Sequence, residues 1–136
     1  MRRLTLSLTA KARATVLTHT RAVAPEEACG LLFGSRSRAG LRIDRVAMVR
    51  NVSPHPATSF ALDPVALLRH LDDPALLGVV HSHPVGALTF SAADRTSAHN
   101  WPGLVWMLVL PGDALLAATP HAAGWAFHTV QVEAAD

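Results

Sequence analysis

An α/β or α+β domain, with one mixed β-sheet flanked by helices, is the fold class that this 136-residue sequence predicts. Short apolar runs bounded by Gly, Pro and Asp recur along the chain and indicate buried strands. Helix-start signals lie among them at Thr9, Asp63-Pro64 and Ser91. No repeat or linker composition divides the chain, so residues 1–136 are expected to form a single domain.

The first half of the chain predicts an alternation of short strands and one helix. A helix capped by Thr9 is expected to run to about residue 24, where Pro25 ends it. Along residues 41–52 the alternation of apolar and polar residues is interrupted near Val46, which indicates a bulge. The expected strands here are residues 4–8, 28–34 and 41–52.

The second half predicts two further helices and the central strand. Asp63-Pro64 starts a helix that ends near residue 71, because an Asp cap followed by Pro at the first helical position is favourable. A loop over residues 84–90 precedes the helix of residues 91–99. The expected strands are residues 60–62, 76–83, 104–110, 114–119 and 125–132, of which 104–110 and 114–119 form a hairpin.

Two histidines mark the end of the central strand. Alternation along residues 76–83 places Leu77, Val79, His81 and His83 on one face. Two imidazoles with one carboxylate supply three ligands for a zinc ion whose fourth position stays open, and Asp94 follows one helical turn into the next element. Iron, cobalt and manganese suit such ligands too. An isolated histidine pair is more simply read as two core residues.

Ser91, Asp94 and Glu27 each have an ordinary structural interpretation. Ser91 and Asp94 form S-x-x-D, a near match to the helix capping box, and on spacing alone that is the favoured role. If Asp94 directs its carboxylate towards a metal, it is not expected to cap the helix as well. Glu27 stands next to Glu26, and periodicity does not separate these two carboxylates.

Taken together, these residues resemble the JAMM metalloprotease motif of the JAB/MPN family. The motif consists of His81-Ser82-His83, then Ser91 and Asp94 at fixed spacing, with Glu27 three residues before Gly30. The resemblance runs from residue 4 to about residue 130, and one departure is Phe90, where bacterial relatives commonly have Pro. It implies a cytidine-deaminase-like sandwich of the compact bacterial type. It also implies Zn²⁺ on His81, His83 and Asp94, Glu27 as general base and Ser91 as oxyanion donor.

The function that the resemblance implies is zinc-dependent hydrolysis of an amide bond by an isopeptidase or peptidase. The substrate would be the C-terminal Gly-Gly tail of a small ubiquitin-like or sulfur-carrier protein, held as an added strand at a sheet edge. Family members that cleave ubiquitin chains carry large insertions, whereas residues 52–60 and 99–104 leave room for short loops only. The alternative is a non-catalytic MPN-type scaffold. A nucleobase deaminase needs a P-C-x-x-C signature, which one cysteine excludes.

Composition limits the partners and the compartment. The single Cys29 excludes an internal disulfide, and no apolar run approaches the ~18 residues of a membrane span. With no signal-peptide core after Met1, a cytoplasmic protein without a membrane partner is expected. Five arginines lie between positions 36 and 50. No aromatic residues interleave with them, so a solvated face is favoured over a nucleic-acid site. The sequence leaves the oligomeric state open.

Overall fold

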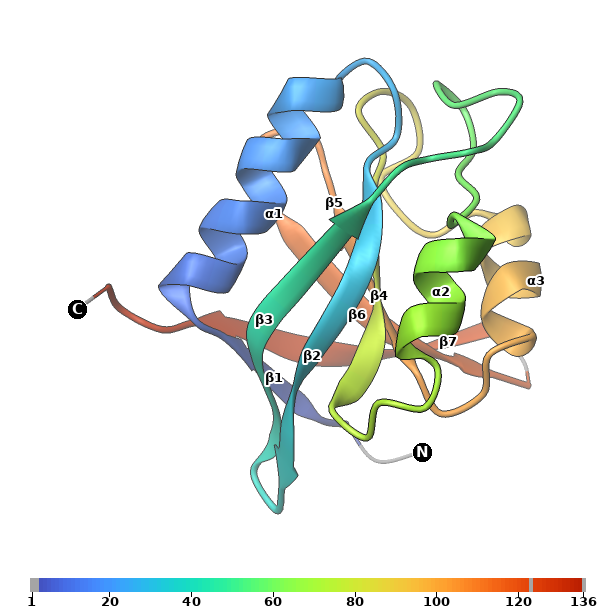
Figure 1. The fold of residues 1–136 in the computed structure, drawn as a ribbon. Helices are drawn as coiled ribbons and strands as arrows, with labels where there is room; N and C mark the ends of the chain where they lie inside the picture. The colour runs from blue at the N-terminus through green and yellow to red at the C-terminus, as the bar shows by residue number, and fades with distance from the viewer. Residues whose placement is uncertain (1–2, 123, 136) are drawn as a thin grey trace.

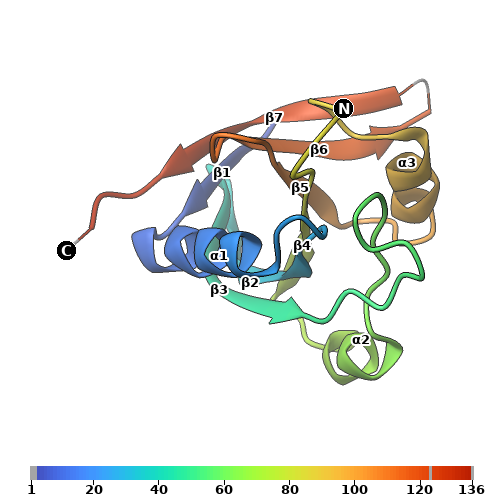
Figure 2. The ribbon, with the colours of Figure 1, turned by 90° about the horizontal axis from the view of Figure 1, so that it is seen from above.

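The computed structural model describes residues 3–122 and 124–135, and within them a single curved sheet is layered by three helices. Figure 1 shows the sheet with α1 on one side and α2 and α3 on the other. Seen from above, the strands curve around α1 (Figure 2). The predicted α/β class, with a mixed sheet flanked by helices, is confirmed.

The strands form one continuous hydrogen-bonded order, β1-β3-β2-β4-β5-β6-β7, and β1 pairs in parallel with both β3 and β7. Strand β1 pairs with β3 only over Gly40–Ile43, whereas the remainder of β3 pairs with β2 alone, so among the described residues an open sheet edge remains along that part of β3. The strands are β1 (Thr5–Leu8), β2 (Cys29–Ser37), β3 (Gly40–Val49), β4 (Leu76–Ser82), β5 (Val105–Val109), β6 (Leu115–His121) and β7 (Gly124–Val132).

All three predicted helices form, and each begins at the predicted capping residue. The helices are α1 (Ala10–Val23), α2 (Pro64–His70) and α3 (Ala92–His99). The hydroxyl of Thr9 accepts a hydrogen bond from the amide of Ala12, and the Asp63 carboxylate accepts one from Val65. These side chains satisfy amide groups that a helix start leaves without partners. None of the helices in the described part of the chain combines the length and apolar character needed to cross a bilayer.

Apolar side chains fill both faces of the sheet. One cluster lies inside the curve and joins α1 to the strands, while the other lies outside, where it meets α2 and α3. Their main members are Leu6, Val16, Leu32, Ile43, Val80 and Met107 inside, and Leu31, Phe33, Val79, Phe90, Trp106 and Leu108 outside. The sheet is therefore the middle layer of a sandwich.

Strand β2 is longer than predicted, since the Gly-Ser pair that was expected to end it lies within the strand. It continues to Ser37, which pairs with Gly40 across a tight turn to β3. Gly34 is required there because a Cβ atom would lie 1.7 Å from the carbonyl oxygen of Arg42. Pairing with β3 thus overrides the local turn signal.

Two bulges interrupt the strand pairing. The bulge predicted near Val46 is confirmed in β3, where Phe33 pairs with Arg45 and Gly34 with Ile43, so the extra residue is Asp44. Leu32 pairs with Gly78, whereas Phe33 pairs with Leu76, so Leu77 is an extra residue in β4. Leu77 accordingly packs in the inner cluster, and its predicted place on the face of Val79 is wrong. Residues 60–62 form no strand beyond an isolated bridge from Leu62 to Asn51.

The arginine-rich segment is held by contacts within the protein. Arg42 binds both carboxylate oxygens of Glu133, at 2.8 and 3.0 Å. Arg45 reaches Asp73 at 3.3 Å and lies over the ring of Phe33. These contacts support the interpretation of the segment as a solvated strand face.

His128 on β7 gives stability a predicted pH dependence. Its Nδ1 atom accepts from the amide of Leu4 at 3.0 Å, and Nε2 contacts the Thr119 hydroxyl. Burial, aided by Arg3, lowers the pKa of His128. The folded state thus keeps the ring neutral while the unfolded state takes up a proton. Stability should therefore fall as pH drops through about 6.5.

Urea denaturation in EDTA between pH 7.5 and 5.5 checks this expectation. His128→Asn is the reference because its amide oxygen can accept from Leu4 without titrating. The wild type should lose its stability advantage over the variant as pH falls. Parallel pH dependences of the two proteins would contradict this role of His128.

Candidate metal centre

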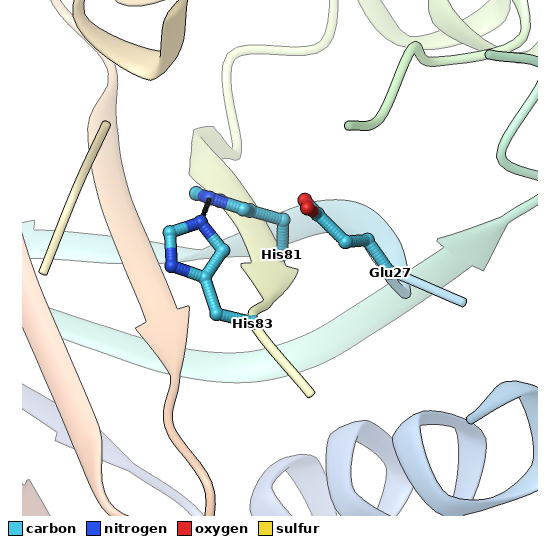
Figure 3. Close-up of side chains that lie close together, drawn as sticks. All are labelled: Glu27, His81 and His83. Carbon is cyan, nitrogen blue, oxygen red and sulfur yellow. Dashed lines mark hydrogen bonds between the residues drawn. The ribbon is translucent and has the colours of Figure 1, made fainter. Parts of the chain in front are cut away.

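Three separate segments converge at one end of β4. His81 lies within the strand and His83 directly follows it, Glu27 precedes β2, and Asp94 lies in the first turn of α3. All four side chains are buried, with at most 6% of any of these residues exposed. Figure 3 shows the Glu27 carboxylate directed towards the two imidazoles. The donor atoms of Glu27, His81 and His83 all lie within 4.8 Å of one another.

The closest donor set consists of the two histidines and Asp94. Oδ2 of Asp94 lies 3.2 Å from Nε2 of His81 and 3.2 Å from Nε2 of His83. The two Nε2 atoms are 3.3 Å apart. Ligands about 2.0–2.1 Å from a tetrahedral zinc ion lie about 3.3–3.4 Å from one another. The three atoms thus form a triangle with the dimensions of one face of a zinc tetrahedron.

Ser91 and Asp94 also form a complete capping box. Oδ2 of Asp94 accepts from the amide of Ser91 at 2.8 Å, and the Ser91 hydroxyl oxygen accepts from the amide of Asp94 at 3.0 Å. The same carboxylate oxygen therefore caps the helix and faces both imidazoles, so capping does not turn it away from them. The Ser91 hydroxyl acts only as an acceptor in this pair, and its proton stays available for donation.

Neighbouring groups fix both imidazole rings. Nδ1 of His83 lies 3.1 Å from the carbonyl oxygen of Ala87, a contact that places the proton on Nδ1 and leaves Nε2 as the free lone pair. His81 is stacked on Phe60, with ring centroids 4.4 Å apart, and Trp106 meets its edge at 5.8 Å. Both Nε2 atoms therefore have a defined direction.

Glu27 differs from Glu26 in its burial. Glu26 is exposed, whereas Glu27 is 5% exposed and its Oε1 atom has no hydrogen-bond partner among the described residues. Burial raises the pKa of Glu27 to about 7, with His83 opposing the shift and Asp94 adding to it. A carboxyl group that titrates near neutrality can take up and release a proton.

Burial and mutual contacts shift the pKa values of the two histidines and Asp94 in different directions. Burial lowers the pKa of His81, while the contact with Asp94 raises the pKa of His83. Burial works to raise the pKa of Asp94, but its contacts with the imidazoles of His81 and His83 and with the amide of Ser91 hold it well below its usual range. Asp94 is therefore a carboxylate at neutral pH, as a metal ligand must be.

A cavity of about 200 Å³ gives access to this cluster. One wall is the loop of residues 57–60, and the other wall is formed by Val85, Ala87 and the start of α3. Glu27, His83, Ser91 and Asp94 line it. The cavity thus lies between two chain segments, with the buried donor atoms of the cluster on its wall.

The residues present fit a divalent metal. Two imidazoles and a carboxylate form a common zinc donor set, and the inward Oε1 atom of Glu27 is buried without a partner in the described chain. Cys29 offers no competing thiolate chemistry, because burial together with Glu27 raises its pKa to about 12. His81, His83 and Asp94 are thus the residues that could hold the ion.

Sequence reasoning missed the residues that support this cluster. Phe60, which the sequence predicts in a short strand, stacks on His81, and the carbonyl oxygen of Ala87, in the predicted loop, contacts Nδ1 of His83. Ser82 accepts from the amide of Ala28 at 2.8 Å through its hydroxyl and so ties the strand end to the Glu27 segment. Its place between the two histidines was the one signal that could have identified it.

Comparisons with known proteins show which family and which solved structure this chain is similar to. A family model described as prokaryotic homologs of the JAB domain matches residues 9–125. A "Probable TtuB-protein conjugate cleaving protease" from Thermus thermophilus is 37% identical over 85 residues, which cover 59% of this chain and 54% of the relative. The chain thus spans about half the length of that relative. The solution structure of a protein from Desulfitobacterium hafniense matches with a TM-score of 0.83 at 27% identity, covering 96% of this chain and 94% of the other.

The donor triangle predicts zinc binding that depends on Asp94. Purified protein should bind about one zinc ion per chain, and Asp94→Ala should bind zinc much more weakly because one of three ligands is gone. Elemental analysis after dialysis against dilute zinc measures both. Asp72→Ala, which removes an exposed carboxylate, should bind as the wild type does. A wild type without stoichiometric zinc, or an Asp94→Ala variant that keeps it, would contradict the assignment.

Proposed function

The chain belongs to the family of prokaryotic JAB-domain homologues, and on that basis we propose that it is a zinc-dependent isopeptidase or peptidase. It hydrolyses an amide bond at the C-terminal tail of a small ubiquitin-like or sulfur-carrier protein. The observation that carries this proposal is the buried triangle of His81, His83 and Asp94, beside which Oε1 of Glu27 has no hydrogen-bond partner within the described part of the chain. A scaffold without catalysis would not need these buried polar groups, whose burial costs stability.

His81, His83 and Asp94 hold the metal in this proposal. Zinc bound there would act as a Lewis acid towards a carbonyl oxygen and would lower the pKa of a coordinated water towards ~7. The protein supplies the orientation, since Ala87 fixes one imidazole ring and Phe60 the other. The amide of Ser91 fixes the carboxylate.

Glu27 moves the proton. Its pKa of about 7 lets it accept a proton from the attacking water and then deliver that proton to the leaving amine. The amide of Glu27 donates to the carbonyl oxygen of Pro56 at 2.7 Å, which ties the backbone of Glu27 to the loop of residues 52–61. Glu26 is turned to solvent and takes no part.

Ser91 supplies a hydrogen bond to the oxyanion that forms at the scissile carbonyl. Its hydroxyl oxygen is oriented by the amide of Asp94, and its remaining proton can donate towards the cavity. A donor fixed before the reaction stabilises developing charge without reorganisation.

The tail of the substrate would lie extended between the loop of residues 57–60 and the start of α3. A Gly-Gly terminus suits a cavity of about 200 Å³ because it has no side chains. A relative is named as a protease that cleaves TtuB-protein conjugates, which supports a carrier of the ubiquitin-like, sulfur-transfer class. The short loops around the cavity offer no clamp for ubiquitin chains.

Intact-mass analysis tests the proposal directly. The zinc-loaded protein is incubated with a sulfur-carrier protein extended past Gly-Gly by cysteine or a short peptide, and separately with ubiquitin chains. The extended carrier should be cut after Gly-Gly, and the ubiquitin chains should stay intact. Efficient cleavage of ubiquitin chains alone would overturn the substrate class, and cleavage of neither substrate would favour the scaffold.

Glu27→Gln should keep the metal but lower turnover by ~10²–10⁴, because the amide keeps the shape of the side chain and cannot accept a proton. The matched control is Glu26→Gln, which changes the exposed neighbour and should leave turnover near the wild-type value. Turnover and zinc content are measured on the same preparations. Dependence on Glu26 with a dispensable Glu27 would show that the wrong carboxylate has been chosen.

Ser91→Ala should have two separate effects. Turnover should fall by ~10²–10³ through loss of the oxyanion donor, and the free energy of unfolding should fall by about 1 kcal/mol through loss of the cap. Steady-state kinetics and urea denaturation measure these effects independently. A variant that loses stability and keeps full turnover would reduce Ser91 to a helix cap.

A further inference from the structure

We propose that Asn51 is a positioning residue that fixes the Glu27 segment and the Phe60 wall of the cavity with one side chain. Asn51 lies just beyond the end of β3 and touches neither the donor triangle nor the cavity. The inference goes beyond the proposed function, although one of its readouts is the proposed hydrolysis.

The Asn51 amide uses both of its ends. Nδ2 donates to the carbonyl oxygens of Glu27 at 3.0 Å and Ser59 at 3.0 Å, and lies 3.4 Å from that of Pro56. Oδ1 accepts from the amides of Ser53 at 3.0 Å and Ala61 at 3.1 Å. These contacts use the two donors and two acceptor sites of one primary amide.

Those contacts hold together the two ends of the loop formed by residues 52–61. The amide of Val52 donates to the carbonyl oxygen of Ala61 at 3.0 Å, and the amide of Glu27 donates to Pro56 inside the loop. Asn51 is the side chain that bonds to both ends of the loop and also to Glu27. The loop and the proposed general base therefore share one anchor.

The anchor reaches the donor triangle through Phe60. Phe60 stands between Ser59 and Ala61, and Asn51 binds the backbone of both neighbours. The ring of Phe60 stacks on His81, whose Nε2 atom is one corner of the triangle. Asn51 thus fixes Glu27 on one side of the site and the ring that covers His81 on the other.

Asparagine is required by the donor and acceptor pattern. Aspartate would keep the acceptor for Ser53 and Ala61 but would present a second acceptor oxygen to the carbonyl groups of Glu27 and Ser59. Alanine would lose all of these contacts. Asn51→Asp therefore removes the links to Glu27 and Ser59 and retains the contacts with the amides of Ser53 and Ala61.

The test compares Asn51→Asp and Asn51→Ala with Ser53→Ala, each as the full chain loaded with zinc. Ser53 is a matched control because its hydroxyl accepts from His55 and contacts Ser59 within the same loop, without touching Glu27. Both Asn51 variants should keep about one zinc per chain and lose ~10–10² in kcat, since small misplacement of reacting groups is costly. KM should change less than kcat. Ser53→Ala should keep kcat within about 3-fold.

Amide hydrogen exchange, followed by mass spectrometry, gives a readout that does not need catalysis. Exchange should accelerate in the peptide that contains Glu27 for both Asn51 variants, and in the peptide that contains Ala61 for Asn51→Ala, which also loses the acceptor for the Ala61 amide. It should accelerate only within residues 52–61 for Ser53→Ala. If the wild type hydrolyses nothing, the proposed function fails while the exchange data still test Asn51.

Two results would overturn the inference. One is an Asn51→Asp variant with wild-type kcat, and the other is unchanged exchange at Glu27 in both Asn51 variants. If Asn51→Ala does not fold, the nearly isosteric Asn51→Asp carries the test alone.

Discussion

The contact between one carboxylate oxygen and two imidazole nitrogens is the interaction on which the rest of the site depends. Oδ2 of Asp94 lies 3.2 Å from both His81 and His83 in a region where none of the three residues is more than 6% exposed. Burying three such groups is unfavourable unless they pair with one another or with a cation. The arrangement is therefore stable only as a unit, and a divalent ion would complete it.

The fold brings that unit together from distant parts of the chain. Strand β4 lies between antiparallel β2 and parallel β5, so its C-terminal end carries the histidines next to the start of β2 and the Glu27 segment. Ser82 holds this junction through the backbone of Ala28. The crossover from β4 to β5 contains α3, which places the capped end of that helix over the same strand end. Rigid backbone elements thus set the donor positions, as a preorganised site requires.

The parts predicted from sequence are those with local causes. The caps at Thr9, Asp63 and Ser91 and most strand cores depend on neighbouring residues, and the structure has them where expected. The bulge at Leu77 depends on pairing with a distant strand, so alternation alone assigned that residue to the wrong face. The roles of Phe60 and Asn51 arise from contacts between segments far apart in sequence. The two functions of Oδ2 of Asp94 could be seen only in three dimensions.

The most direct test of the central claim is a crystal structure of the zinc-loaded protein with data collected on both sides of the zinc absorption edge. The account predicts one anomalous peak, bound by Nε2 of His81, Nε2 of His83 and Oδ2 of Asp94 at about 2.0–2.2 Å. Glu27 should lie outside the ligand set. A peak elsewhere, no peak, or a zinc ion held by Glu27 in place of Asp94 would contradict it.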